Sequence, residues 1–147
     1  MVASLLIILI STGLLLYWFR YMCLLILSTQ ATREYSQEVA CENGLHFAEL
    51  QRVLEETQGE ALALLAGWMD RDYRVLNRLL GTSGTQEEEA GFERALLAAD
   101  FAAMGAWFRL TRRFSEAAAR KALLERSKII QHLANSLGER EGQHSAA

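Results

Sequence analysis

The feature that most constrains this chain is a long apolar run near its N-terminal end. Residues 2–19, VASLLIILISTGLLLYWF, contain no charged side chain, and Arg20 is the single charged residue before Arg33. As a helix, at about 1.5 Å per residue, the run covers roughly 27 Å, close to the hydrocarbon thickness of a bilayer. Burying it in a soluble core would need a larger core than a chain of 147 residues can build. We therefore expect a transmembrane anchor over residues 1–28.

Aromatic and basic residues mark the end of this expected anchor. Tyr17, Trp18 and Tyr21 lie close to Arg20 in the sequence, and aromatic rings favour the headgroup level of a membrane. No basic side chain precedes the run, whereas Arg20 and Arg33 follow it. The positive-inside rule then predicts a single-pass membrane protein whose C-terminal domain lies in the cytoplasm.

A second interpretation of the same segment is a signal peptide that is cleaved near Ala31. The product would be a secreted, soluble helical bundle. Signal peptides have basic residues before a shorter apolar core. This chain has no basic side chain before the run, and Thr29-Gln30-Ala31 is a weak cleavage sequence. We favour the anchor, and N-terminal sequencing of the mature protein separates the two interpretations.

The remainder of the chain is predicted to be helical. It contains no proline, so no position forces a helix to break. No segment after residue 30 alternates apolar and polar residues as a half-buried strand does. The polar residues 29–44 are expected to continue the anchor as a helical stalk or linker. The sequence therefore predicts an all-α protein, with an N-terminal transmembrane helix followed by a small antiparallel bundle of three to four helices over residues 45–138.

Glycines and capping residues predict where the first helices of this bundle begin and end. Apolar residues with helical spacing follow Gly59, and this helix should end at Gly81. Thr85 with Glu88 has the spacing of a capping box, which predicts the start of the next helix. That helix should run from about residue 86 to residue 114.

The helix over residues 86–114 has an unusually wide apolar face. One stripe on this face consists of Phe92, Leu96, Ala99, Ala103, Leu110 and Phe114, and a second consists of Leu97, Phe101, Met104 and Phe108. Such a face needs neighbours on two sides, so we expect this helix to be the central one. Its many alanines and glycines would allow another helix to approach closely.

A last helix is expected after Ser115, whose hydroxyl can cap it. Leu123, Ile130 and Leu137 follow at helical spacing, and Gly138 should end the helix. Residues 139–147 are then expected to be a flexible tail.

The best candidate for a metal site is the polar triplet Glu42, His46 and Glu49. On one continuous helix, the spacing i, i+4, i+7 would put all three on one face, where imidazole and carboxylates can bind zinc or iron. Gly44 weakens the helix at this point, and the chain lacks the paired Glu-x-x-His motifs of di-iron bundles. A solvated polar face is the simpler interpretation, so we expect no cofactor. A membrane-associated metal-binding protein or enzyme stays the alternative.

Charge is distributed unevenly along the chain. Residues 34–60 carry seven glutamates against one arginine, whereas residues 109–128 carry seven basic residues against two glutamates. In one interpretation the two stretches pack together and neutralise each other, which we favour. In the other, basic side chains face an anionic surface such as lipid headgroups. The residues that would make this contact are Arg109, Arg112, Arg113, Arg120 and Lys121.

No catalytic residues can be assigned from the sequence. Neither a nucleophile with a neighbouring base nor a glycine-rich phosphate loop with its lysine is recognisable, so we do not expect an enzyme. The acidic residues after residue 30 outnumber the basic ones by four, which argues against nucleic acid as a partner. The expected function is a membrane-tethered helical interaction module, such as a small subunit or adaptor of a membrane-associated assembly. Its partners would be the lipid bilayer and another protein or a second copy of the chain.

Overall fold

The computed structural model describes residues 1–28, 35–57, 59, 61–82 and 88–146, and its contacts divide the chain into two compact units, residues 1–30 and 31–147. The first unit consists of one helix, α1 (Val2–Ser28). This helix is long and apolar enough to cross a membrane. Its bounds agree with the segment that the charge-free run predicts.

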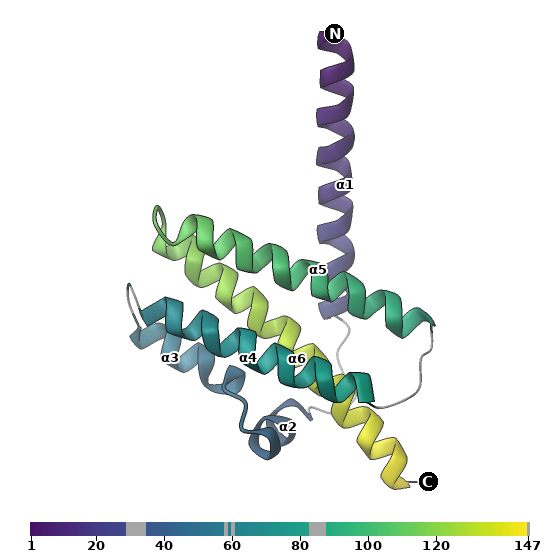
Figure 1. Ribbon diagram of the computed structural model, residues 1–147, viewed down its shortest axis with the longest axis vertical. Coiled ribbons are helices and arrows are strands. Elements are labelled where there is room, and N and C mark those ends of the chain that lie inside the picture. Colours follow the sequence, from purple (N-terminus) through teal and green to yellow (C-terminus); the bar gives the residue numbers. More distant parts are fainter. Residues whose placement is uncertain (29–34, 58, 60, 83–87, 147) are drawn as a thin grey trace. The chain divides into compact units, whose positions relative to one another are not determined.

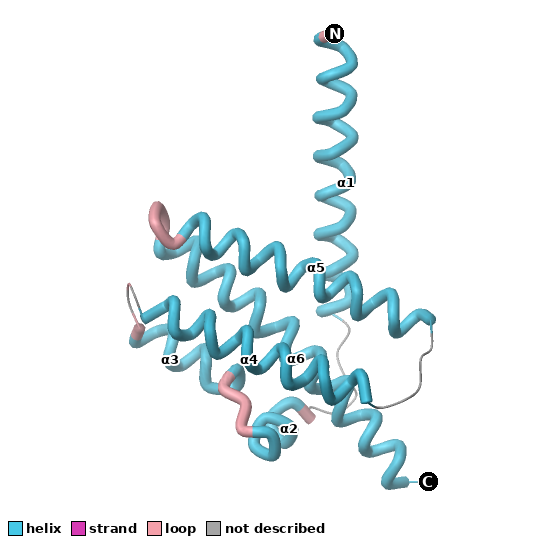
Figure 2. Tube along the Cα trace, in the orientation of Figure 1, coloured by secondary structure: helices cyan, strands magenta, loops and turns pink. Residues whose placement is uncertain are grey.

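The second unit consists of five α-helices and one short 3-10 helix in the described residues (Figure 1). They are α2 (Ser36–Asn43), η1 (Phe47–Glu49), α3 (Leu50–Glu56), α4 (Ala61–Thr82), α5 (Glu88–Thr111) and α6 (Glu116–Ala146). Figure 2 shows helices and loops but no strand in the described part of the chain. The prediction of an all-α protein is therefore confirmed.

The central helix of this unit is α6. It packs against α5 and α4, which lie on either side of it in Figure 1, and it also contacts α2, η1 and α3. Leu123, Ile129 and Ile130 of α6 are completely buried. The expectation that the helix over residues 86–114 would be central is wrong. Only the second of its two apolar stripes faces the core, and Phe92 and Leu110 of the first stripe are 62% and 59% exposed.

The C-terminal end of the bundle also differs from the expectation. Helix α6 continues through Gly138 as far as Ala146, so the described residues 139–146 are helical rather than a flexible tail. Gly138 is buried because Tyr35 packs directly on it. A Cβ atom added at Gly138 would overlap Tyr35 Cβ and lie 2.8 Å from Tyr35 Cγ. The glycine therefore allows a close approach between two segments and does not end the helix.

Residues 35–43 are part of the bundle and do not form a stalk. In α2, Val39 and Ala40 are buried, and the backbone N–H of Ser36 donates to Asn135 Oδ1 of α6 at 2.8 Å. The bundle therefore begins before residue 45. Residues 29–34, which carry the other part of the expected stalk, lie outside the described residues.

Helix ends in the middle of the chain agree better with the sequence. Helix α4 ends at Thr82, one residue beyond Gly81. The Ser115 hydroxyl oxygen accepts a hydrogen bond from the backbone N–H of Ala118 at 3.3 Å, which confirms the predicted cap of α6. Helix α5 ends at Thr111, three residues before the expected end. The predicted cap at Thr85 lies outside the described residues.

Candidate functional site

The predicted metal triplet does not share one helical face. Helix α2 ends at Asn43, and Gly44 has a φ angle of 59°, in the left-handed region, so the chain turns before His46. Glu42 therefore belongs to α2, His46 to a loop and Glu49 to η1. No group of three or more His, Cys, Asp or Glu side chains in the described residues is arranged to hold a metal ion. The assumption of one continuous helix through Gly44 is wrong.

The loop around His46 is instead held by a buried carboxylate from α4. Asp72 Oδ2 accepts hydrogen bonds from the backbone N–H groups of His46 at 2.7 Å and Phe47 at 2.9 Å. The His46 ring meets Trp68 edge to face, with ring centroids 5.1 Å apart. Desolvation by burial raises the pKa of Asp72 above its ordinary value, although the two hydrogen bonds oppose the shift. These contacts dock the α2–η1 loop on α4, which is a structural role.

An open groove runs between α4 and α5. Both helices pack on α6, and two adjoining cavities of about 720 and 520 Å³ lie between them. Both cavities are lined by Ala63, Phe108 and Arg112, so they form one continuous groove. The walls of the larger cavity are mostly made of small residues, namely Ala63, Ala66, Gly67, Ala98, Ala102 and Gly105.

The floor of this groove is built around Arg126 of α6. Its side chain is only 4% exposed, and its guanidinium forms an ion pair with Asp70. The guanidinium carbon also lies 3.9 Å from the centroid of the Phe101 ring, and that ring stacks on Tyr73 with centroids 4.1 Å apart. Arg126 Nε is buried and has no hydrogen-bond partner. A buried N–H without an acceptor is costly, so this atom marks a place where an acceptor would be stabilising.

The groove carries an excess of positive charge. Arg74, Arg109 and Arg112 are exposed and line the larger cavity, whereas Asp70 is the single acidic residue among its lining residues. Because guanidinium groups bind carboxylates and phosphates in a two-pronged geometry, the groove is suited to an anionic ligand. Small walls and the aromatic floor leave room for apolar groups between these charges.

Four of the five residues predicted to contact an anionic surface are exposed, and Arg120 is not. Arg109, Arg112 and Arg113 lie at the C-terminal end of α5, where they are exposed and line the groove. Lys121 is exposed on α6. Arg120 is used inside the bundle, as described next.

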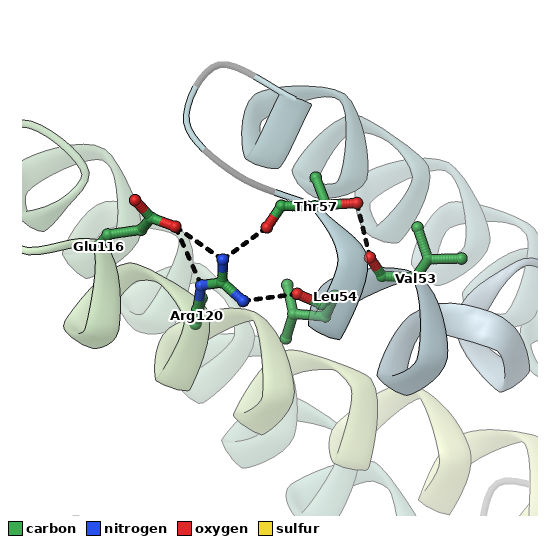
Figure 3. A network of polar contacts seen from close by, with 5 residues as sticks. All are labelled: Val53, Leu54, Thr57, Glu116 and Arg120. Atoms are coloured by element: carbon green, nitrogen blue, oxygen red, sulfur yellow. Dashed lines mark hydrogen bonds and ion pairs between the residues drawn. The ribbon is translucent and has the colours of Figure 1, made fainter.

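Arg120 binds the C-terminal end of α3 (Figure 3). Its two terminal nitrogens donate to the carbonyl oxygens of Leu54 and Thr57, both at 2.6 Å, and Glu116 Oε1 accepts from the same guanidinium at 2.7 Å. The last carbonyls of a helix lack partners within the helix, and a cation is favourable at this end. The basic stretch thus does pack beside the acidic one, but Arg120 binds backbone carbonyls of the acidic stretch rather than its carboxylates.

Sequence reasoning identified α5 as a helix with room for close neighbours, but it did not find the groove. Asp72 and Asp70 differ by two positions in one helix, yet Asp72 is 1% exposed and Asp70 is on the surface. The sequence signal that could have indicated the groove is the series of alanines and glycines on α5, together with Gly67 on α4. Comparison of the chain with protein-family models, curated proteins and solved structures found no match.

Proposed function

We propose that this protein is a membrane-tethered helical interaction module whose groove between α4 and α5 binds an acidic, amphipathic helix of a partner protein. The observation that carries the proposal is the groove itself, with small apolar walls, four arginines and one buried guanidinium N–H without an acceptor. A helix with apolar residues on one side and carboxylates along its edge would satisfy these features together.

A helix is the favoured occupant because of the shape of the groove. The helices α4 and α5 both pack on α6, so a further helix lying between them would complete a fourth position of the bundle. Small wall residues such as Gly67, Ala102 and Gly105 would allow its backbone to come close. Carboxylates on its edges would face Arg74, Arg109 and Arg112 and remove the repulsion between these cations.

The proposed role of α1 is to anchor the module, with the bundle on the cytoplasmic side. Anchoring restricts the bundle to one surface and raises its effective concentration toward partners there. Alkaline carbonate washing tests this part of the proposal, because an anchored chain stays in the membrane pellet. Release into the supernatant with an intact α1 would contradict an anchor, and a mature N-terminus near Ala31 would indicate a secreted bundle instead.

Site-specific photocrosslinking tests the groove. A benzoylphenylalanine at Ala102, an exposed residue of the groove wall, should give an adduct of defined mass with one protein in native membranes. The crosslinked peptide should come from an acidic, amphipathic segment. The same probe at Ala117, exposed on α6, is the matched control.

Charge reversal shows whether the adduct depends on the arginines. The double variant Arg109→Glu/Arg112→Glu should remove the adduct at Ala102, because two attractive contacts become repulsive. Equal labelling at Ala102 and Ala117, or an adduct that survives charge reversal, would contradict the proposal. An adduct with a second copy of this chain or with lipid would also contradict it.

A further inference from the structure

A second surface of α5 is apolar although it faces solvent. The outer face of α5, defined here as Phe92, Leu96, Ala99, Ala103, Trp107 and Leu110, does not line the groove, and its residues are exposed apart from the half-buried Leu96. Phe92, Trp107 and Leu110 are 62%, 50% and 59% exposed. No charged residue belongs to this face over its length of about 27 Å. An exposed, continuous apolar strip of this kind indicates an interface.

Three charged residues of α5 lie on the side that faces the bundle instead. Glu93 Oε1 lies 2.8 Å from His132 Nε2 of α6, and Arg94 donates to Asn77 Oδ1 of α4 at 3.3 Å. Asp100 is 1% exposed. The side of α5 that faces the bundle therefore makes these polar contacts, whereas the outer face carries no charged side chain.

We infer that the outer face of α5 binds the same face of a second copy of this chain, with the two α5 helices antiparallel. The order of residue sizes supports a twofold contact centred between Ala99 and Ala103. With this centre Ala99 faces Ala103 of the other copy, Phe92 faces Leu110, and Trp107 faces the exposed Ala95. Small residues at the centre allow close approach and large residues at both ends cover it, which makes the face complementary to itself.

Charge at the two ends of α5 selects the antiparallel arrangement. The helix begins with Glu88 and Glu89, and Arg112 and Arg113 follow directly after its last residue. In an antiparallel pair the acidic start of one helix lies beside the basic end of the other. A parallel pair would bring like charges together. The same acidic start argues against a lipid surface along the whole face, because anionic headgroups would repel it.

The outer face of α5 is separate from the groove, so the proposed pairing does not depend on whether a partner occupies the groove. Its test uses the full-length chain in native membranes, with Cys23 and Cys41 replaced by serine. Two differently tagged chains are co-expressed, one with Ala99→Cys and one with Ala103→Cys, and the membranes are oxidised. A disulfide between the two tags is expected only when both variants are present. The exposed pair Ala48→Cys and Ala117→Cys serves as the control.

A charge swap makes the test independent of the introduced cysteines. Arg113→Glu should reduce the crosslinked fraction several-fold, and adding Glu89→Arg should restore it. Ala103→Arg should convert the dimer to a monomer in mild detergent, as measured by light scattering, whereas Ala117→Arg should not. A disulfide formed by either single variant alone would indicate a parallel pair and overturn the proposal. A monomeric wild-type chain would also overturn the proposal. In that case, a blue shift of Trp107 fluorescence on anionic vesicles would show that the outer face contacts lipid.

Discussion

The contact between Arg120 and the end of α3 allows a quantitative prediction. Arg120→Met removes two hydrogen bonds of 2.6 Å to the carbonyl oxygens of Leu54 and Thr57 but keeps an apolar side chain of similar reach. Hydrogen bonds to charged groups contribute about 1.5–3 kcal/mol each. The Arg120 side chain is 27% exposed, so water partly replaces the lost donors. We therefore expect the free energy of unfolding to fall by about 2–3 kcal/mol.

Two further variants separate the carbonyl contacts from the ion pair. Glu116→Gln should cost only about 0.5 kcal/mol, because this i, i+4 pair is on the surface and Glu116 is 47% exposed. The free energy of unfolding of Arg120→Lys should lie between those of the other two variants, because an ammonium group cannot reproduce the planar guanidinium that reaches both carbonyls.

Urea titration of the full-length protein in mild detergent measures these differences, and hydrogen exchange shows where they arise. Amides of α3 should exchange faster in Arg120→Met, whereas those of α5 should not change. If Arg120→Met lowers the free energy of unfolding no more than Glu116→Gln does, the carbonyl contacts do not stabilise α3.

Two other positions allow similar predictions. Asp72→Ala leaves the N–H groups of His46 and Phe47 without an acceptor and should cost about 2–4 kcal/mol, as measured by urea titration. Because burial raises the pKa of Asp72, the folded state holds this proton more tightly than the unfolded chain, so the contribution of this carboxyl to stability falls as the pH rises from about 3.8 through the raised pKa. Asp72→Asn should therefore match the wild type at low pH and exceed it above this range; a difference that does not vary with pH would contradict the assignment. Gly138→Ala should lower the thermal midpoint, because its Cβ would overlap Tyr35, whereas Gly67→Ala meets no atom within 4 Å and should raise it through helix propensity. Equal shifts for the two alanine variants would show that Tyr35 does not pack on Gly138.

Local signals in the sequence predict local structure well in this protein. The charge-free run lies within α1, Gly81 lies at the end of α4, and Ser115 caps α6. Each of these signals acts within a few residues of the chain. They depend on backbone geometry and on hydrogen bonds to near neighbours, which the sequence order already fixes.

Long-range packing could not be predicted in the same way. Gly138 has the spacing of a helix end, but its role is set by Tyr35, about a hundred residues earlier in the chain. The burial of Asp72 depends on the loop at His46 and Phe47 that packs on it, and helical periodicity does not show which neighbour covers which face. The wide apolar surface of α5 predicted two contact faces. One is covered by α6, and the other is the outer face for which we propose a second copy of the chain.

The hydrogen bond between α2 and α6 affects the order in which the parts of the protein fold during synthesis. Ser36 and Asn135 are 99 residues apart, so α2 can reach its partner only after almost the whole chain has been synthesised. Contacts between residues so distant in sequence close slowly, and a nascent chain exposes its unpaired surfaces until then. As the proposed anchor, α1 would enter the membrane long before the ribosome completes α6. A chain truncated before Asn135 should therefore be inserted normally and yet fail to dock α2, which would expose the apolar residues of α2 to proteolysis.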